Sequence, residues 1–210
     1  MKKFIISIDQ GTTSSRVILF DSKAKIVFKS QFEFKQYFPK NGWVEHDPKE
    51  IWSTTIKALK KVIKKASRLK GKIISIGITN QRETTIMWDK RTGKPVYNAI
   101  VWQDRRTQKY CNFLKSKNYE NNFRKKTGLF IDSYFSATKI KWILNNIPQS
   151  KRLIKSNNLL FGTVDTFLIW KLTNGKQHLT DATNASRTML YNINNNKCCL
   201  LYTSDAADEI

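Results

Sequence analysis

Long apolar runs are absent from this sequence of 210 residues: none approaches the roughly 20 residues that a membrane-spanning helix needs. The chain opens with Met and two lysines followed by an apolar stretch, as a secretion signal does. Asp9 interrupts that stretch, and no small-residue cleavage site follows it. We therefore interpret the opening as a buried strand and expect a cytoplasmic protein that does not enter a membrane.

Cysteine and histidine are also scarce. The three cysteines, Cys111, Cys198 and Cys199, form no Cys-x-x-Cys pair, and an odd number with two adjacent residues makes a poor disulfide framework. His46 and His178 are far apart in the sequence, and nothing beside either one marks it as a catalytic base. We expect reduced thiols, structural histidines and no metal site built from cysteine.

Acidic residues are few: 16 Asp and Glu stand against 38 Lys and Arg, which gives a net charge of +22. Nucleic-acid binding is one explanation, because clustered Lys and Arg release counterions from a phosphate backbone. A genome rich in A and T is the other, because its codons favour Lys, Asn and Ile in any fold. The lysines are spread through every segment without a nucleic-acid-binding motif, so we favour the second explanation and expect no nucleic-acid partner. The charge would still attract anionic ligands such as nucleotides.

Apolar residues make up 40% of the chain, enough for a sizeable core, and their spacing predicts three strands near the start. Residues 4–9 and 16–21 are apolar runs that each end in an acid, and the polar stretch 10–15 joins them as a hairpin. From residue 26 to residue 34, mostly apolar side chains alternate with polar ones, which is typical of a strand covered on one side. We expect the three strands to form an antiparallel meander.

A helix is predicted from residue 48 onward. Asp47 is placed to cap it, Pro48 suits its first position, and Glu50 stands where a capping box needs an acid. Gly71 is expected to end it. One face carries lysines and the other carries apolar residues at helical spacing, namely Trp52, Ile56, Leu59, Ile63 and Ala66.

Strands and helices follow each other in the rest of the chain. The continuous apolar run at 73–78 predicts a strand covered on both faces. A strand at 84–88 leads into a turn at 89–94 and an extended return at 95–102. Helices are expected at 107–117, 136–147 and 163–172. This order predicts an α/β layered domain.

The segment DQGTTSSR, residues 9–16, is the first with distinctive chemistry. Asp9 at the end of a buried strand needs a positive partner, and a hydrated Mg²⁺ is one such partner. A glycine and four hydroxyl residues on a tight turn can direct backbone N–H groups at an anion, and Arg16 adds a cation. The residues alone leave open the alternative of a polar hairpin loop that satisfies its own turn.

The segment GITNQRETT, residues 77–85, places polar groups directly after an apolar run. Arg82 offers a fork of donors and Glu83 a pair of acceptors, which suits a small polyol whose hydroxyls both donate and accept. The alternative is a surface ion pair of little energetic worth. Trp102 and Tyr134 could add an apolar wall and a phenol, or could be core aromatics.

Seven segments resemble the glycerol kinases of the FGGY carbohydrate kinase family, in order and at the family's spacing. The resemblance covers roughly residues 3–191. NQRETT is similar to the family's glycerol site, where pentulose kinases have a different sequence. The segments are DQGTTSSR, GWVEHDP, GITNQRETT, NAIVWQDRRT, IDSYFSATK, LLFGTVDTFLIWKLT and TDATNASRTML.

The resemblance implies the N-terminal domain of the ribonuclease-H-like, actin-like ATPase fold that sugar kinases share with actin and Hsp70. It implies that ATP, with Mg²⁺, phosphorylates glycerol to sn-glycerol 3-phosphate; another FGGY sugar or polyol kinase is the nearest alternative. The nucleotide phosphates would be contacted by Thr12, Thr13, Ser14 and Arg16, and the Mg²⁺ by Asp9. Glycerol would be hydrogen-bonded by Arg82, Glu83 and Tyr134, with Trp102 as the apolar wall. A full-length member is expected to be a homo-oligomer.

The resemblance also implies that part of the catalytic machinery lies elsewhere. The family's general base is an Asp in an Asp-Gln motif that follows this segment, so no residue here is assigned as catalytic and we expect the chain to be inactive alone. We expect residues 1–198 to be an incomplete N-terminal, glycerol-binding domain, with the C-terminal domain absent. Residues 199–210 (CLLYTSDAADEI) carry three acids and no Lys or Arg, and they resemble a translated sequencing adapter. We interpret them as a non-native tail.

Overall fold

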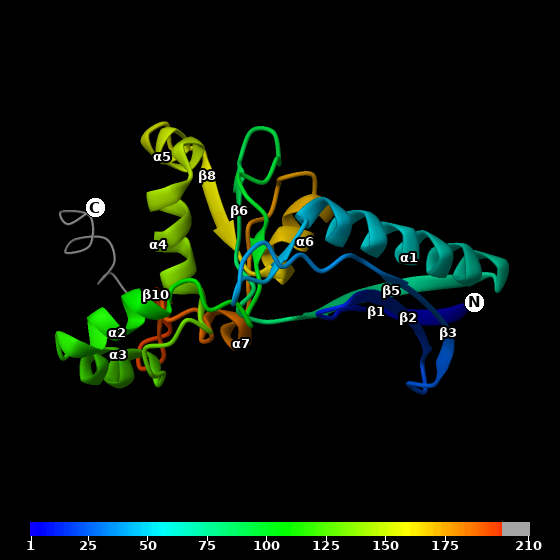
Figure 1. The fold of residues 1–210 in the computed structure, drawn as a ribbon. Helices are drawn as coiled ribbons and strands as arrows, with labels where there is room; N and C mark the ends of the chain where they lie inside the picture. The colour runs from blue at the N-terminus through cyan, green and yellow to red at the C-terminus, as the bar shows by residue number, and fades with distance from the viewer. Residues whose placement is uncertain (199–210) are drawn as a thin grey trace. The chain divides into compact units, whose positions relative to one another are not determined.

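The computed structural model describes residues 1–198, and the chain divides into two compact units (Figure 1). The first unit consists of residues 1–37 and 46–81. Among the described residues, the second unit consists of residues 38–45 and 82–198. The segment interpreted as a non-native tail, 199–210, lies outside the described residues.

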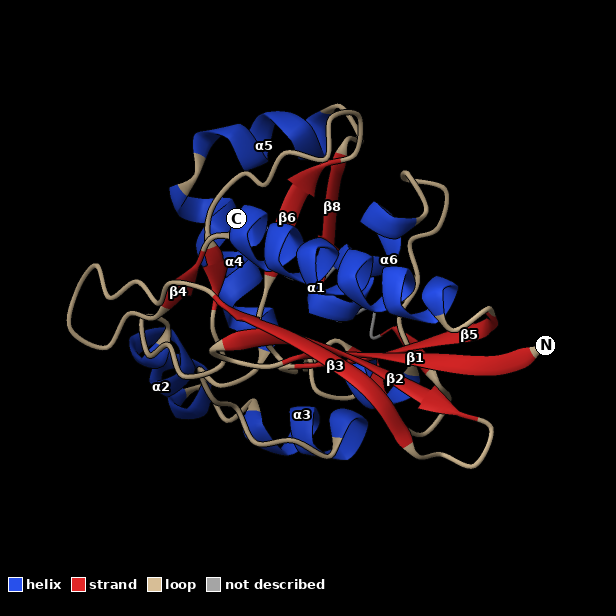
Figure 2. Ribbon diagram, turned by 90° about the vertical axis from the view of Figure 1, so that its right-hand side faces the viewer, coloured by secondary structure: helices blue, strands red, loops and turns tan. Residues whose placement is uncertain are grey.

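The first unit is a four-stranded sheet in the order β3-β2-β1-β5. The strands β1 (Lys2–Gln10), β2 (Ser14–Asp21) and β3 (Ile26–Glu33) are antiparallel neighbours, which confirms the predicted meander. The fourth strand, β5 (Gly71–Asn80), runs parallel to β1. A parallel neighbour needs a crossover, and α1 (Pro48–Arg68) provides it along one face of the sheet (Figures 1 and 2).

The helix α1 begins as predicted but without the predicted capping box. The Asp47 side chain accepts a hydrogen bond from the backbone N–H of Lys49 at 2.8 Å. Glu50 does not return to the cap, because its carboxylate accepts from the backbone N–H of Lys35 at 2.9 Å and from the Tyr37 hydroxyl at 2.8 Å. Glu50 therefore fastens the segment after β3 to the start of α1.

The end of α1 also differs from the prediction. The helix ends at Arg68, before Gly71, which was expected to end it, and Lys70 adopts the left-handed conformation with a φ of 51°. Gly71 instead opens β5, where a Cβ would lie 2.1 Å from the Phe4 ring. The glycine is needed for this close approach, and not for a helix stop.

The buried face of α1 is rotated from the predicted one. Trp52 and Ile56 are only half-buried and Ile63 is exposed. The Thr55 hydroxyl donates to Ser15 Oγ at 3.2 Å, which helps to fix the face turned towards the sheet. The buried positions are Pro48, Ile51, Thr55, Ala58, Leu59, Val62 and Ala66.

The prediction that residues 73–78 are covered on both faces is wrong. In the described part of the chain β5 is an edge strand, and no strand pairs with its outer side. Ile74 is 52% exposed and Ile76 is 46% exposed. A continuous apolar run therefore marks an open edge here and not a central strand.

The second unit combines short strands with several helices. The strand β6 (Ile86–Asp89) pairs antiparallel with β8 (Leu159–Gly162), and Thr85 bridges to Ile100 in β7 (Ala99–Ile100). The predicted helices are confirmed as α2 (Gln108–Ser116), α4 (Ser136–Asn146) and α6 (Val164–Leu172). Other elements lie outside the predicted ranges: α3 (Glu120–Thr127), α5 (Pro148–Lys155), α7 (Ala182–Ala185), β9 (Tyr191–Asn192) and β10 (Lys197–Cys198). The two-residue strand β4 (Glu45–His46) has one residue in each unit.

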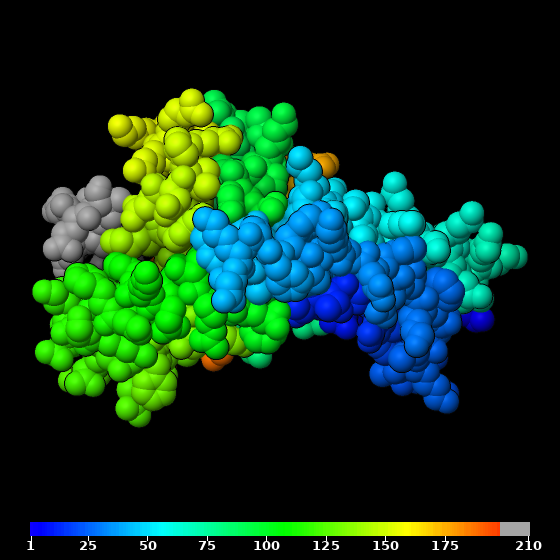
Figure 3. Space-filling model, in the orientation of Figure 1, coloured from blue at the N-terminus to red at the C-terminus, as the bar shows by residue number. Residues whose placement is uncertain are grey.

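Two helices of the second unit share a small core. Buried side chains of α2 and α3, among them Cys111, Leu114 and Phe123, pack in one cluster with Ile131. The two helices form neighbouring parts of the surface (Figure 3, green). Burial raises the pKa of the Cys111 thiol, which disfavours the reactive thiolate form.

A buried arginine joins two of the family-like segments in the second unit. The Arg106 guanidinium contacts Glu45 Oε1 at 2.7 Å and Asp104 Oδ2 at 2.8 Å. It lies over the Trp43 ring at 3.8 Å and the Trp142 ring at 4.5 Å. Much of GWVEHDP and NAIVWQDRRT is therefore built around this ion-pair cluster, which has a structural role.

No helix within residues 1–198 is long and apolar enough to cross a membrane.

Candidate functional site

The predicted anion-binding turn is shorter than the polar stretch 10–15. The loop proper contains residues 11–13, because Ser14 and Ser15 already belong to β2. The Gly11 N–H donates to the Ser14 carbonyl at 2.9 Å and closes the turn. Thr12 is half-buried and Thr13 is exposed, so these two threonines form the surface of the loop.

The four consecutive hydroxyl groups do not form one cluster. Ser15 is fully buried, and its hydroxyl pairs with Thr54 Oγ1 of α1 at 2.9 Å. Ser14 Oγ accepts from Gln31 Nε2 at 2.8 Å. Ser15 therefore fastens β2 to the helix, while Ser14 keeps its own proton for another acceptor.

Asp9 and Arg16 face each other across β1 and β2. The Arg16 Nη1 lies 3.8 Å from Asp9 Oδ2, and its Nε donates to Gln31 Oε1 at 2.8 Å. Both side chains are about two-fifths exposed, at 42% for Arg16 and 40% for Asp9. An ion pair with this separation and solvent exposure contributes little to stability, so both groups remain accessible to a ligand.

A chain of two side-chain amides, half-buried Gln36 and buried Gln81, and one buried imidazole lies behind the loop, within the first unit. Gln36 Nε2 donates to the Thr12 carbonyl at 2.9 Å, and Gln36 Oε1 lies 2.6 Å from His46 Nε2. Gln81 Nε2 lies 3.1 Å from the Gly11 carbonyl and 3.3 Å from His46 Nδ1. His46 thus connects the two side chains that hold the loop carbonyls.

Glu83 is the most constrained of the predicted polyol residues. Its φ of 64° lies in the left-handed region, which a residue other than glycine adopts at a cost of about 1 kcal/mol or more. Its carbonyl accepts from Ser136 Oγ at 3.1 Å and from Thr85 Oγ1 at 3.2 Å. Its carboxylate is buried and accepts from Arg187 Nε at 2.6 Å. Residues held in strain this way are concentrated at functional sites.

Arg187 connects Glu83 with the predicted aromatic wall. Its guanidinium lies 5.7 Å from the Tyr134 ring centre and 5.0 Å from that of Phe135. The Tyr134 ring in turn lies 5.5 Å from the Trp102 ring at 55°. The structure therefore brings Glu83, Tyr134 and Trp102 into one neighbourhood through a residue that was assigned no role. The only sequence signal for Arg187 is its place in the family-like segment TDATNASRTML.

Arg82 does not pair with Glu83 in the way that their adjacency suggests. Arg82 is exposed, whereas the Glu83 carboxylate is buried against Arg187. The surface ion pair considered as the alternative is therefore not what Glu83 forms. The donors of Arg82 remain at the surface beside the constrained glutamate.

A buried lysine supports the loop that carries Tyr134. Lys139 has no exposed surface, and its ammonium donates to the Tyr134 carbonyl at 2.6 Å. Burial lowers the pKa of Lys139 to about 7, while the nearby carboxylates of Asp104, Glu83 and Asp132 act against that shift. Lys139 fixes the backbone of the aromatic wall from inside the unit.

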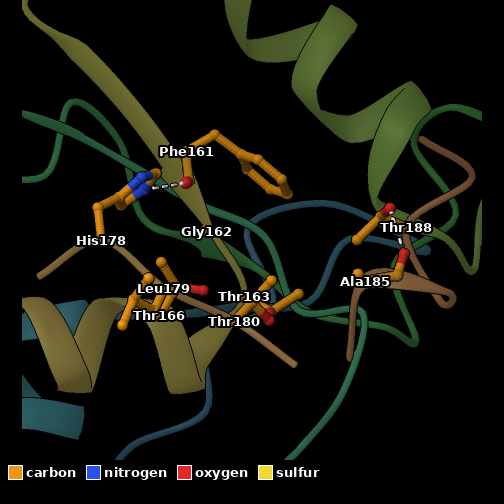
Figure 4. A pocket seen from close by; sticks show the side chains of 9 residues that line it. All are labelled: Phe161, Gly162, Thr163, Thr166, His178, Leu179, Thr180, Ala185 and Thr188. Atoms are coloured by element: carbon orange, nitrogen blue, oxygen red, sulfur yellow. Dashed lines mark hydrogen bonds between the residues drawn. The ribbon is translucent and has the colours of Figure 1, made fainter. Parts of the chain in front are cut away.

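A separate pocket of about 240 Å³ opens in the second unit (Figure 4). His178 lies at one side, with its Nε2 2.8 Å from the Phe161 carbonyl. The Thr180 hydroxyl donates to Asp165 Oδ2 at 2.7 Å. None of the predicted polyol residues lines it. The lining residues are Phe161, Gly162, Thr163, Thr166, His178, Leu179, Thr180, Ala185 and Thr188.

Known proteins share both the sequence and the fold of this chain. A glycerol kinase from Petrotoga mobilis is 59% identical over 193 residues, which is 92% of this chain and 39% of that protein. The crystal structure of Plasmodium falciparum glycerol kinase with ADP has a TM-score of 0.88 at 42% identity, over 94% of this chain and 39% of that one. A gluconate kinase from Lactobacillus acidophilus has a TM-score of 0.80 at 24% identity, over 94% and 38%, and shows the fold alone.

These similarities define the family and the extent of the match. The chain spans about 39% of the length of the curated relatives it matches. The structural neighbours are sugar kinases, which confirms the predicted ribonuclease-H-like, actin-like ATPase fold of an N-terminal domain. The sequence model of the N-terminal domain of FGGY carbohydrate kinases matches residues 4–198. The chain belongs to the FGGY family of carbohydrate kinases.

Proposed function

We propose that the protein to which this chain belongs is a glycerol kinase. It transfers the γ-phosphoryl group of ATP to a terminal hydroxyl of glycerol and forms sn-glycerol 3-phosphate. The observation that carries the proposal is the strained, buried Glu83, held by Arg187 beside the rings of Tyr134 and Trp102. The similarity to glycerol kinases at 59% identity supports glycerol over the sugars of other FGGY kinases.

The second unit supplies the chemistry for a small polyol. Arg187 donates a hydrogen bond to one carboxylate oxygen of Glu83. The other oxygen can therefore accept from a hydroxyl of glycerol. The phenol of Tyr134 and the exposed guanidinium of Arg82 add hydrogen bonds, and Trp102 packs the carbon chain. Such a site rejects an analogue that lacks a hydroxyl, because buried polar groups would lose their partner.

The first unit supplies the chemistry for nucleotide phosphates. We assign the phosphate contacts to Thr12, Thr13, Ser14 and Arg16. Asp9 fits Mg²⁺ that is bound through one carboxylate, water and phosphate oxygens, since no cluster of three or more His, Cys, Asp or Glu within residues 1–198 could hold an ion alone. The ion, when bound, neutralises charge on the transferred phosphoryl group, and the surrounding residues orient that group.

The remaining assignments concern the whole protein. Residues 1–198 are assigned as the N-terminal, glycerol-binding domain and 199–210 as a non-native tail. A general-base Asp is supplied from outside these residues, so the chain alone does not turn over. The whole protein is proposed to be a cytoplasmic homo-oligomer that binds neither nucleic acid nor membrane.

The test is a hybrid kinase in which residues 1–198 precede the remaining part of the Petrotoga mobilis glycerol kinase. A coupled assay of ADP release compares glycerol, xylulose and gluconate as acceptors, and the 210-residue chain is assayed beside it. We expect glycerol to be preferred and the short chain to be inactive. Preference for xylulose or gluconate would support another FGGY kinase, and a folded hybrid without turnover would refute the proposal. Turnover by the short chain would show that the base lies within it.

A further inference from the structure

His46 lies at the centre of the hydrogen-bonded chain behind loop 11–13. We propose that His46 is a positioning residue for the nucleotide: through Gln36 and Gln81 it holds the carbonyls of Thr12 and Gly11 inward, so that the loop presents N–H groups to phosphate. This rests on the proposed function of the loop. His46 itself touches no ligand in the proposal and acts only through the two glutamines.

The pattern of donors and acceptors fixes the form of the imidazole. Gln36 uses its amide nitrogen to donate to the Thr12 carbonyl, so its Oε1 must accept from His46 at Nε2. His46 Nδ1 then carries the lone pair and can accept from Gln81 Nε2. The network therefore assigns the neutral imidazole protonated at Nε2.

The surroundings keep His46 neutral. Burial lowers its pKa to about 4, while the Glu50 carboxylate acts in the opposite direction. The Phe34 ring packs against the imidazole edge-on, with centroids 5.1 Å apart. A proton on Nδ1 would point at the amide donors of Gln81, so the charged form would break the link to that side chain.

Because the peptide unit is planar, the direction of each loop carbonyl also fixes the direction of the following N–H group. A trans peptide is planar, so its C=O and the N–H of the following residue point in opposite directions. When Gln36 holds the Thr12 carbonyl at 2.9 Å, the Thr13 N–H is directed away from Gln36. Carbonyls turned outward would instead repel phosphate oxygens, and fixed N–H groups need no reorganisation when phosphate arrives.

The loop is held at further points by the same network. The Gln81 N–H donates to the Gln10 carbonyl at 2.7 Å, and the Phe34 N–H donates to the Thr13 carbonyl at 3.3 Å. Gln10 Nε2 donates to the Gly11 carbonyl at 2.8 Å. His46 joins the loop contacts of Gln36 and Gln81, because it is hydrogen-bonded to both of these side chains.

The kinetic test uses His46→Phe and His46→Gln in the hybrid kinase. Phe keeps an aromatic ring but removes both hydrogen bonds, while Gln keeps a donor towards Gln36. We expect His46→Phe to raise the KM for ATP about tenfold, as the loss of one buried hydrogen bond can do, and His46→Gln to recover part of it. The KM for glycerol should change less than about twofold, within the scatter of such effects. His178→Phe is the matched control and should change neither constant.

A second readout does not depend on activity. Nitrogen-15 spectra of the 210-residue chain should show His46 protonated at Nε2, and His46→Phe should speed hydrogen exchange at the Thr13 amide. The opposite tautomer, an unchanged KM for ATP, or equal rises in both KM values would overturn the proposal. An inactive parent hybrid would instead refute the proposed function, and the spectra alone would then decide the role of His46.

Discussion

The Nε of Arg187 donates to the carboxylate of Glu83 at 2.6 Å, although 104 residues separate the two in the sequence. The Glu83 side chain is 4% exposed and that of Arg187 is 32% exposed, so the carboxylate is the more deeply buried partner. A buried carboxylate needs a cation or strong donors to stay ionised. Arg187 therefore gives this buried carboxylate a charged partner and orients it, as the proposed binding of a glycerol hydroxyl requires.

Replacing Arg187 should impair the acceptor site more than the nucleotide site. In the hybrid kinase, Arg187→Gln is expected to raise the KM for glycerol tenfold or more, and to lower stability by about 1–3 kcal/mol because Glu83 loses its charged partner. Arg187→Lys should recover part of the loss. Arg124→Gln removes an arginine that lies over the exposed Phe130 ring and is the control. Equal effects of Arg187→Gln and Arg124→Gln would contradict this role.

Removing the cation of the Arg106 cluster should destabilise the second unit. Arg106→Met leaves Glu45 and Asp104 buried without their shared cation, which is expected to cost about 3–5 kcal/mol. Lys115→Met removes an exposed partner of Glu120 and should cost less than about 1 kcal/mol. Urea denaturation of the 210-residue chain measures both. A small effect of Arg106→Met would mean that the carboxylates find other partners.

The stability of the chain should fall in mild acid because of His46. Its folded pKa of about 4 lies below the usual 6.5, so between these values the unfolded chain binds a proton that the folded chain excludes. Stability from neutral His46 is present above pH 6.5 and is lost as the pH falls towards 4, by about 3 kcal/mol in total. Urea denaturation at pH 7 and pH 5 should show a smaller difference for His46→Phe than for the parent chain. An identical difference in both proteins would count against a buried neutral imidazole.

Two glycines of β5 should respond oppositely to alanine. At Gly71 a Cβ would lie 2.1 Å from the Phe4 ring, so Gly71→Ala is expected to cost about 1–3 kcal/mol through overpacking. At Gly77 nothing lies within 4 Å of the added carbon, and Gly77→Ala should be neutral or stabilise by up to about 1 kcal/mol. Thermal denaturation of the two variants gives the comparison. Loss of stability in Gly77→Ala alone would show that the glycines have been assigned the wrong roles.

Local signals in the sequence predicted the elements that local interactions decide. The meander of β1 to β3 follows from alternation and a polar turn, and the start of α1 follows from Asp47 and Pro48. The face that α1 buries did not follow, because the hydrogen bonds that Ser15 of β2 makes with Thr54 and Thr55 of α1 contribute to it. The spacing of apolar residues in the sequence gives no information about such hydrogen bonds between elements.

The candidate site was predictable only where its residues lie in recognisable segments. Glu83, Tyr134 and Trp102 stand in such segments, and the second unit brings them together. Arg187 was missed as a site residue, because its partner is distant in the sequence and one arginine in a polar stretch carries no spacing signal. A place in such a segment does not by itself mark a site residue: Arg106 stands four residues after Trp102, and it forms buried ion pairs with Glu45 and Asp104.

The open edge of β5 has a consequence for how the isolated chain behaves in solution. An uncovered strand that displays Ile74 and Ile76, with Lys72 as its one charged residue, is a template on which a second copy can add a strand. The net charge of +22 keeps copies apart through long-range repulsion. Salt shortens the range of that repulsion and leaves the apolar edge unchanged, so colloidal stability should decline as ionic strength rises.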